Sequence, residues 1–429
     1  MHHSHDFLLK SFAMENLANV LDRSLSPAQK SLVQKIAREA AALQMRAYLV
    51  GGFVRDAILR RAVNDFDLVF EGDATKLGRV LARTYGGRVT VHEAFHTATW
   101  FVDDDNFVDL ISARSETYEH PAALPTVQLG SLADDLRRRD FTINAMAFCL
   151  DESRYGELTD PLGGREDLRR GLIRVLHSRS FVDDPTRLFR TVRYAARYGF
   201  EIAPETADLI PDALQYVDAL SPERLRHELD LILDEEDPVP MVEKLWALGI
   251  AEAAPPALPS GEATRTRIGW MSRLPSIVKE RGETRWMIWL MSSSEKEIRA
   301  LDKRLRFTAD LSKKILAAAS IFRELDSFAG TRPSDCTRRL DKAPEQAIVA
   351  VTICAPHGEA RAALETYLAK WKDVKPFTDG DALLKMGVPF GPRIGQILWD
   401  LRAAWLDGMI ESKSQENALL NKIITEEKF

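Results

Sequence analysis

The chain has 429 residues, 45% of them hydrophobic and 28% charged, and its formal net charge is −6. This is the composition of a globular protein with room for about two to four domains, which excludes a disordered or fibrous chain. The weak negative charge excludes a global positive field, so any contact with nucleic acid must use a local basic face.

Cysteine usage and hydropathy indicate the cellular compartment of the protein. Cys149, Cys336 and Cys354 lie far apart and form neither the close pairs of a zinc site nor a disulfide framework. No apolar run approaches the roughly 20 residues of a membrane span, and the first residues lack the order of a secretory signal. We therefore expect a cytoplasmic protein with no membrane partner.

The first part of the chain alternates between strand and helix patterns. After an N-terminal lead over residues 1–33, a head domain is predicted over residues 34–150. Strand-like alternation and a turn at Gly51-Gly52 define its elements. The predicted strands are 46–50, 65–70, 88–92, 97–102 and 107–113, and the predicted helices are 53–61 and 73–85. This order implies a small mixed sheet.

From Asp134 onward the pattern is almost wholly helical. A turn cluster, Asp160-Pro161 with Gly163-Gly164, suits a joint between domains. Helical spacing of apolar residues, with Gly and Pro breaks, predicts the parts that follow. These are a neck over 151–236, a body over 237–330 and a tail over 331–429. The predicted fold class is α+β: a head with a small mixed sheet, followed by all-α neck, body and tail domains.

Asp65 and Asp67 are the first candidate site residues. They are two apart on a predicted strand, so both carboxylates project from one face, within reach of a shared divalent ion. Two such ions can activate an attacking hydroxyl and stabilise a pyrophosphate leaving group. Alone the pair is a weak signal, because a solvent-exposed strand face gives the same pattern.

The turn before this strand strengthens the interpretation. Adjacent Gly51 and Gly52 let backbone N–H groups approach a phosphate closely at the start of a helix. Arg55 and Asp56 follow on the first helical turn, where Arg55 can neutralise triphosphate charge and Asp56 can orient it. The alternative for Arg55 and Asp56 is a surface ion pair.

The stretches LVGGFVRDAIL and DFDLV resemble the metal and triphosphate motif of the polymerase-β-type nucleotidyltransferase superfamily. Within it, the chain resembles the class II CCA-adding tRNA nucleotidyltransferases and the bacterial poly(A) polymerases. The resemblance implies that the head is a nucleotidyltransferase domain, with Asp65 and Asp67 as metal ligands. It also implies that Asp109, in FVDLISAR, is the third catalytic carboxylate; an ion pair with Arg114 is the alternative for Asp109.

A second motif, LRRRDFTINAMA, resembles the ribose-recognition motif of the family. The resemblance implies that Arg139, Asp140 and Asn144 face the sugar and the triphosphate. The chemistry is sound, because a 2′-hydroxyl is both donor and acceptor and can meet a carboxylate beside a guanidinium. The alternative is that Arg137–Arg139 form a solvated helix face.

A third motif, FVDDPTRLFRTVRYAARYGF, resembles the helix that serves these enzymes as an amino-acid template. On that resemblance Asp184 and Arg187 hydrogen-bond the Watson–Crick edge of CTP or ATP, and Arg190 holds the helix or the phosphates. Cytosine and adenine both offer an exocyclic amine to a carboxylate, whereas uracil and guanine present a carbonyl there. The alternative is an ordinary helix ion pair between Asp184 and Arg187.

Further stretches support the match, and two positions depart from it. DPLGGREDL resembles the hinge of the family, SPERLRHEL resembles its neck helix cap, and DGDALLKMGVPFGPRIG resembles a tail segment of some members. Asp183 stands where the family often has Glu, and His96 stands where many relatives have Gly. We interpret His96 as a half-buried strand residue rather than an acid or base.

The resemblance implies transfer of CMP and/or AMP from CTP or ATP to the 3′ end of tRNA, with release of pyrophosphate. The implied cofactors are two Mg²⁺ ions, with Mn²⁺ as a substitute. A-adding enzymes, CC-adding enzymes and poly(A) polymerases share these motifs and stay alternatives, as does an RNA-binding protein without turnover. The helical C-terminal half, with basic runs such as Lys303–Arg306, is expected to contact tRNA. The oligomeric state stays open.

Overall fold

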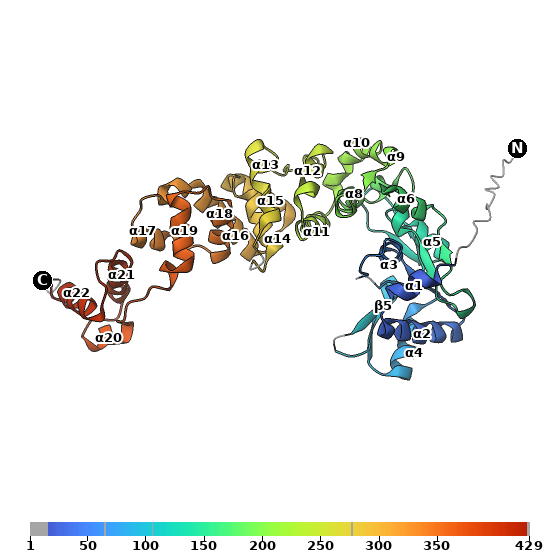
Figure 1. Cartoon of the computed structure of the whole chain (residues 1–429), viewed down its shortest axis with the longest axis horizontal. Helices are drawn as coiled ribbons and strands as arrows, with labels where there is room; N and C mark the ends of the chain where they lie inside the picture. Colours follow the sequence, from blue (N-terminus) through green and yellow to red (C-terminus); the bar gives the residue numbers. More distant parts are fainter. Residues whose placement is uncertain (1–15, 64–65, 105, 276–277, 427–429) are drawn as a thin grey trace. The chain divides into compact units, whose positions relative to one another are not determined.

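A computed structural model describes residues 16–63, 66–104, 106–275 and 278–426 of the chain. The chain divides into two compact units (Figure 1). The first unit runs to Leu220 and includes Leu248–Ala253; the second contains Ser221–Ala247 and the chain from Ala254 onward. In the part of the chain that the structure describes, no helix is long and apolar enough to cross a membrane.

A seven-stranded mixed sheet organises the first unit, in the order β3-β4-β5-β2-β1-β8-β9. Neighbouring strands are antiparallel, except that β2 and β5 are parallel. The connection from β2 to β5 passes through α4 and the β3–β4 hairpin. The strands are β1 (Arg46–Val50), β2 (Leu68–Glu71), β3 (Arg88–His92), β4 (Thr97–Phe101), β5 (Phe107–Ser112), β8 (Ala147–Cys149) and β9 (Leu158–Thr159).

One face of this sheet is covered by α2 (Pro27–Ala42) and α4 (Ala74–Tyr85). The α4 helix packs so closely that a Cβ on Gly78 would lie 3.0 Å from Ala98 Cβ. On the other face, α5 (Leu132–Arg137) covers the central strands, where Leu132 and Leu136 pack with Tyr48, Val50 and Val69. This second face carries the candidate site.

The remaining elements of the first unit are short and mostly helical. Besides α1 (Ala18–Ser24) and α3 (Gly52–Ile58), they include the hairpin β6 (Arg114–Thr117) and β7 (Thr126–Leu129), the 3₁₀ turn η2 (Thr142–Asn144), α6 (Gly164–Arg170), β10 (Leu172–Ile173), α7 (Ser180–Asp183), α8 (Thr186–Tyr198), β11 (Glu201–Ile202), α9 (Pro204–Ala207) and α10 (Ile210–Ala213).

The second unit is entirely helical in its described part. Its core includes Trp286 and Trp289, whose rings stack with centroids 5.7 Å apart. Its helices are α11 (Pro222–Leu233), α12 (Val239–Ala247), α13 (Glu262–Ile268), α14 (Arg281–Leu290), α15 (Glu295–Leu305), α16 (Ala309–Arg323), α17 (Pro333–Leu340), α18 (Glu345–Cys354), α19 (Glu359–Ala369), α20 (Gly380–Lys385), α21 (Pro392–Leu406) and α22 (Lys413–Glu426).

The predicted α+β class is confirmed, and two details of the prediction are wrong. The chain after Asp134 is not almost wholly helical, because β8 and β9 complete the sheet; all three residues of β8 are buried, so its apolar sequence did not alternate. The helix expected to reach residue 61 ends at Ile58, and Arg60 adopts a left-handed conformation.

Candidate functional site

The carboxylates of Asp67 and Asp109 occupy neighbouring strands at one register of the sheet. Leu68 pairs with Leu110, so the preceding residues, Asp67 and Asp109, lie side by side and point to the same face. The Asp67 carbonyl accepts a hydrogen bond from Val50 N at 3.2 Å, which keeps Asp67 in line with β1 although β2 proper begins at Leu68. Asp65 lies outside the described residues.

The surroundings of Asp109 exclude the ion pair with Arg114 and leave its catalytic role a prediction. Asp109 is exposed and accepts a hydrogen bond from Thr99 Oγ1 at 2.6 Å. Arg114 pairs with Glu116 at 3.2 Å instead, so the predicted alternative of an Asp109–Arg114 pair is wrong. The Asp109 carboxylate is therefore available to a ligand on the open face.

These carboxylates fit a hard divalent cation. The described residues contain no group of three or more His, Cys, Asp or Glu side chains arranged to hold a metal. Two adjacent carboxylates on one face nevertheless supply the oxygen ligands that Mg²⁺ prefers, with its remaining positions left for water or phosphate oxygens.

Gly51 is required by conformation and by close approach. Its φ of 67° and ψ of −126° lie in a region that only glycine adopts readily. A Cβ here would also lie 2.4 Å from Nη1 of Arg139. The Arg139 guanidinium therefore rests against the start of α3, whose first turn has no side-chain cap, and a cation lies next to uncapped backbone N–H groups.

Arg55 and Asp56 form a buried pair, so the predicted alternative of a surface ion pair is wrong. Arg55 is 2% exposed and donates to both carboxylate oxygens of Asp56, at 2.9 and 2.7 Å. It also donates to Asn144 Oδ1 at 2.6 Å. Burial disfavours the Arg55 charge, but the hydrogen bond to Asp56 and the electrostatic attraction of Tyr198, Tyr194 and Asp56 together outweigh it and raise the pKa of Arg55 above its usual value.

Asp140 links the same cluster to α8. Its Oδ1 accepts from Asn144 at 2.9 Å, and its Oδ2 accepts twice from Arg190, at 2.9 and 2.7 Å. Burial opposes ionisation of Asp140, but the Arg190 charge and these hydrogen bonds lower its pKa. Asp140, Asn144 and Arg55 thus form one continuous hydrogen-bonded chain from α8 to α3.

Arg139 and its neighbour Arg138 share one buried acceptor, Asp135. Arg139 Nη2 lies 2.9 Å and Arg138 Nη2 lies 2.6 Å from the fully buried carboxylate of Asp135. The predicted alternative, in which Arg137–Arg139 form a solvated face, therefore holds only for Arg137, which is 70% exposed.

Sequence reasoning missed two tyrosines that enclose Arg55. The guanidinium carbon of Arg55 lies 5.3 Å from the ring centroid of Tyr194 and 4.7 Å from that of Tyr198. Tyr198 donates to Asp56 Oδ1 at 3.2 Å, and burial raises the pKa of Tyr198 to about 12, so its hydroxyl stays protonated. Tyr194 and Tyr198 follow Arg190 at intervals of four residues, which places these three residues on one face of a helix. This spacing is visible in the sequence.

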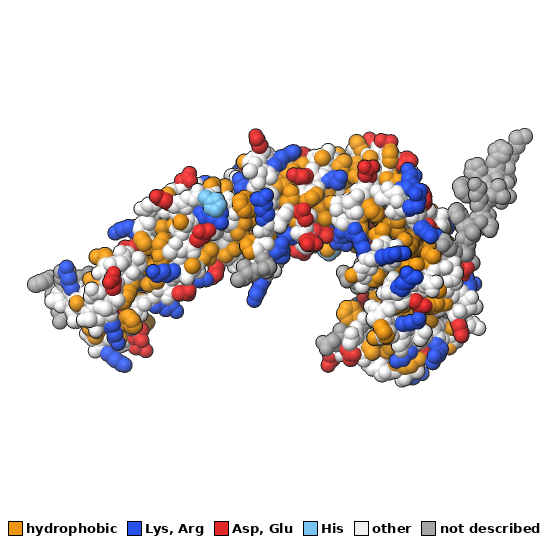
Figure 2. Space-filling view, in the orientation of Figure 1, with side chains coloured by type: hydrophobic (Ala, Val, Ile, Leu, Met, Phe, Trp, Pro, Cys, Tyr) orange, Lys and Arg blue, Asp and Glu red, His pale blue; other side chains and the backbone are white. Residues whose placement is uncertain are grey.

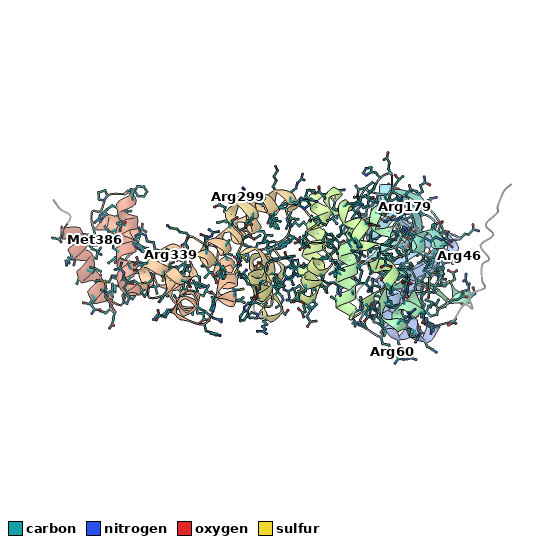
Figure 3. The ribbon with its side chains drawn as sticks, turned by 90° about the horizontal axis from the view of Figure 1, so that it is seen from above. Arg46, Arg60, Arg179, Arg299, Arg339 and Met386 are labelled. Atoms are coloured by element: carbon teal, nitrogen blue, oxygen red, sulfur yellow. The ribbon has the colours of Figure 1, made fainter. Side chains whose placement is uncertain are left out.

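Asp184 and Arg187 lie where the chain enters α8. Asp184 precedes the helix and accepts from Thr186 N at 3.0 Å and Thr186 Oγ1 at 2.6 Å. Arg187 is 5% exposed and donates to the backbone carbonyls of Arg138, at 2.8 Å, and Ser180, at 3.4 Å. Arg187 therefore ties α8 to the end of α5. The neighbouring Asp183 pairs with Arg179 at 3.2 Å. Arg179 is exposed and is labelled in Figure 3.

His96 is not a strand residue. It has a φ of 50° and ψ of 43° and ends a short 3₁₀ turn (Glu93–Phe95) before β4. This left-handed conformation gives a physical reason for glycine at the same position in the family that the sequence resembles.

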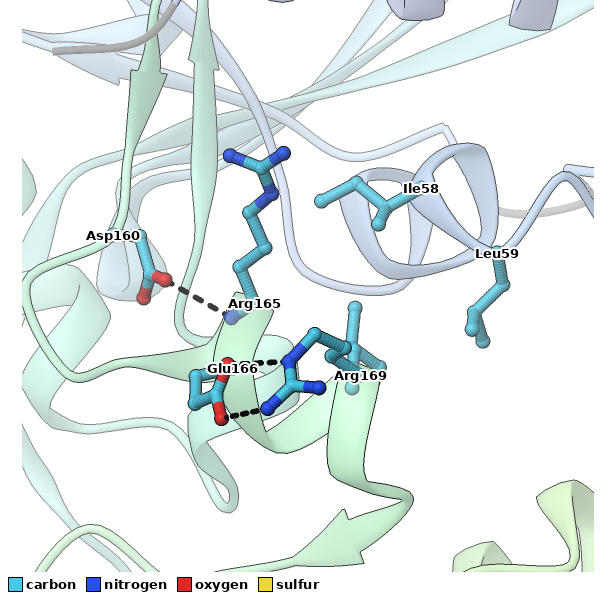
Figure 4. A pocket seen from close by; sticks show the side chains of 7 residues that line it. Ile58, Leu59, Asp160, Arg165, Glu166 and Arg169 are labelled. Atoms are coloured by element: carbon cyan, nitrogen blue, oxygen red, sulfur yellow. Dashed lines mark hydrogen bonds and ion pairs between the residues drawn. The ribbon is translucent and has the colours of Figure 1, made fainter.

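The turn cluster at residues 160–164, predicted as a joint between domains, lies within the first unit and is held by Asp160. Its carboxylate accepts from Gly164 N at 2.7 Å and Arg165 N at 2.9 Å, and Glu166 pairs with Arg169 beside it (Figure 4). A Cβ on Gly164 would lie 2.2 Å from the Thr142 carbonyl oxygen. The start of α6 thus packs directly on η2, which also carries Asn144.

Comparisons with known proteins agree with this geometry. Residues 47–174 match the poly A polymerase head domain, and residues 199–260 match the probable RNA and SrmB-binding site of polymerase A. The A-adding tRNA nucleotidyltransferase of Halalkalibacterium halodurans is 35% identical over 94% of this chain and 95% of that protein. The chain belongs to the tRNA nucleotidyltransferase family.

Solved structures of this family have the same fold. A CCA-adding enzyme in an apo form has a TM-score of 0.83 and 28% identity, covering 96% of this chain and 99% of that chain. The Thermotoga maritima CCA-adding enzyme in complex with tRNA has a TM-score of 0.78 and 26% identity, with the same coverage of both chains. The chain is therefore a nucleotidyltransferase, of a family that uses divalent metal ions.

Proposed function

We propose that this protein transfers AMP from ATP to the 3′ end of tRNA, releasing pyrophosphate. The observation that carries the proposal is the position of Asp67 and Asp109 side by side on the open sheet face, within the first unit that also holds the Gly51–Arg139 contact. Two relatives that match more than 90% of the chain, at 35% and 31% identity, are A-adding enzymes, which favours AMP over CMP.

We infer that Asp65, Asp67 and Asp109 hold two Mg²⁺ ions, with Mn²⁺ as a substitute. Bound there, the ions supply Lewis-acid activation of the primer hydroxyl and charge neutralisation at the leaving pyrophosphate. The chain's own contribution is to keep carboxylates from two parallel strands on one face, so that the hydroxyl and the α-phosphate are brought together.

The incoming nucleotide is assigned to the side of these carboxylates on which α3 begins. The Gly51 N–H donates to the Met146 carbonyl, so the turn at Gly51-Gly52 offers the backbone N–H of Gly52 to the triphosphate, and Arg139 adds a positive charge against the same turn. The ribose is assigned to Asp140 and Asn144. Because Arg190 and Arg55 already hold those two side chains, the ribose contacts are preorganised.

Base choice is assigned to Asp184 and Arg187. A carboxylate accepts from the exocyclic amine of adenine or cytosine, and a guanidinium donates to a ring nitrogen or carbonyl. At the start of α8, the Arg187 guanidinium donates to two backbone carbonyls. These contacts hold in place the group that would recognise the base.

Extension assays on defined tRNA ends test the proposal. We expect tRNA ending in CC to gain one nucleotide with ATP and Mg²⁺, and tRNA lacking all of CCA to gain nothing from CTP. Two additions from CTP followed by one from ATP would make this a CCA-adding enzyme. Long tails from ATP on unrelated RNA would make it a poly(A) polymerase, and RNA binding with no extension would contradict nucleotidyl transfer altogether.

A further inference from the structure

The face that carries Asp109 continues across β5, β4 and β3, and no helix among the described residues covers these strands on that side. Cross-strand pairs place Asp109 beside Thr99, and Thr99 beside Thr90. Two residues earlier on β5, the next row of the same face contains Phe107, Phe101 and Arg88, in that order across the three strands. We call these three residues the aromatic platform. Its first member is separated from Asp109 by roughly 7 Å along the strand.

The aromatic platform is built for stacking but is open to solvent. Phe107 is 61% exposed, so most of its ring is open to solvent. The rings of Phe107 and Phe101 lie 5.8 Å apart at 43°, and the guanidinium carbon of Arg88 lies 3.6 Å from the Phe101 centroid. Rings backed by a cation form the surface on which nucleic-acid bases stack.

We propose that the aromatic platform stacks the base of the 3′-terminal nucleotide of the RNA primer and thereby delivers its hydroxyl to Asp109. The inference rests on the proposed function, which requires a 3′-hydroxyl beside these carboxylates. A nucleotide whose base lies on Phe107 has its sugar within reach of Asp109, one row away on the same face. Stacking is indifferent to base identity, which suits a primer end.

The occupant is the primer rather than the incoming nucleotide. The incoming triphosphate is assigned to the Gly51–Arg139 side, where α3 begins beside β1. The aromatic platform lies on the far side of the carboxylates, across β5 toward β3. Arg88 extends the same row and is placed to meet a phosphate of the incoming RNA strand.

The test compares Phe107→Ala with the unaltered enzyme on two primers in single-turnover AMP transfer. One primer is tRNA ending in CC, and the other is the same tRNA with an abasic terminal nucleotide. We expect Phe107→Ala to weaken primer binding about tenfold or more on the normal primer, with the KM for ATP unchanged. On the abasic primer both enzymes should perform alike, since the stacking partner is gone.

Two variants keep the test interpretable. Phe107→Trp should retain primer binding, because it preserves a stacking ring. Phe95→Ala removes a ring of similar exposure, 57%, at the opposite end of β4, and should change nothing. The proposal is overturned if Phe107→Ala binds the normal primer as the unaltered enzyme does, if its defect persists on the abasic primer, or if Phe95→Ala has the same defect. Absence of AMP transfer by the unaltered enzyme would instead reject the proposed function.

Discussion

Asp109 shows how the register of one strand can place a carboxylate beside another. Nothing about FVDLISAR distinguishes a catalytic carboxylate from a surface one, but the parallel pairing with β2 puts Asp109 next to Asp67. The nearest polar contact of Asp109, Thr99, donates a hydrogen bond and leaves the remaining lone pairs of the carboxylate for a cation.

We expect Asp109→Ala to lower kcat for AMP transfer by about 100-fold or more, because a lost metal ligand removes transition-state charge stabilisation. Binding of tRNA, measured by filter retention without ATP, should change little. Asp104→Ala is the matched control, since Asp104 is an exposed carboxylate on the turn before β5 and should leave kcat unchanged. A normal kcat in Asp109→Ala would remove this residue from the catalytic set.

Arg187 combines a predicted recognition role with buried backbone contacts. We expect Arg187→Ala to change the ratio of kcat/KM for ATP over CTP at least roughly tenfold. It should also lower the free energy of unfolding by about 1–3 kcal/mol, since two carbonyls lose their donor. Arg179→Ala removes an exposed arginine that pairs with Asp183 and should alter neither. Lost stability with an unchanged nucleotide ratio would mean that Arg187 is structural only.

At the scale of elements, the turn into α3 joins a backbone requirement to a contact. We expect Gly51→Ala to abolish transfer and to lower the unfolding free energy, because a Cβ meets Arg139 and the conformation is strained. Gly86→Ala separates the two causes: Gly86 has a φ of +82° but nothing within 4 Å of its Cβ position. It should cost about 1 kcal/mol of stability while leaving kcat intact. Equal kinetic defects in both variants would attribute the effect to strain alone.

Periodicity predicted most of the head because its outer strands alternate between a packed and an open face. β3, β4 and β5 were placed within a residue of their observed ends. β8 was missed because it is buried on both faces, and the β6–β7 hairpin because it pairs only with itself. The burial of Arg55 between Tyr194 and Tyr198 depends on α8 packing near α3, which no local pattern specifies. Sequence motifs identified these polar residues, but only the tertiary packing determines which of them are buried in hydrogen-bonded clusters and which are exposed to solvent.

At the scale of the whole molecule, charge is dispersed. Lys and Arg side chains are spread over both units on the face shown in Figure 2. The net charge of the chain is −6. Several basic residues in the second unit are already engaged: Arg306 pairs with Glu223 at 2.6 Å, and Arg339 pairs with Glu324 at 2.8 Å. Tail contacts with tRNA therefore stay a prediction, to be sought among basic residues outside these pairs.

The two compact units should unfold in separable thermal transitions, and Glu416 provides a marker for the second. Its fully buried carboxylate accepts from Thr378 Oγ1, Phe377 N, Thr378 N and Trp405 Nε1, at 2.7, 3.0, 2.7 and 2.6 Å. Burial opposes ionisation of Glu416, but these hydrogen bonds outweigh it and lower the pKa of its carboxyl. A carboxyl whose pKa is lower in the folded than in the unfolded chain stabilises the fold above the unfolded value, about 4.3, and loses that stabilisation as pH falls through the folded value.

We therefore expect Glu416→Gln to lower the free energy of unfolding of the second unit alone, by about 1–3 kcal/mol at pH 7, because an amide cannot accept from all of these donors. Scanning calorimetry from pH 7 down to about pH 3 should show the loss of stability on acidification to be weaker in Glu416→Gln than in the unaltered protein. Glu411→Gln changes an exposed carboxylate near the start of α22 and should match the unaltered protein throughout. A single transition that shifts as a whole would contradict this prediction and show that the two units unfold as one cooperative body.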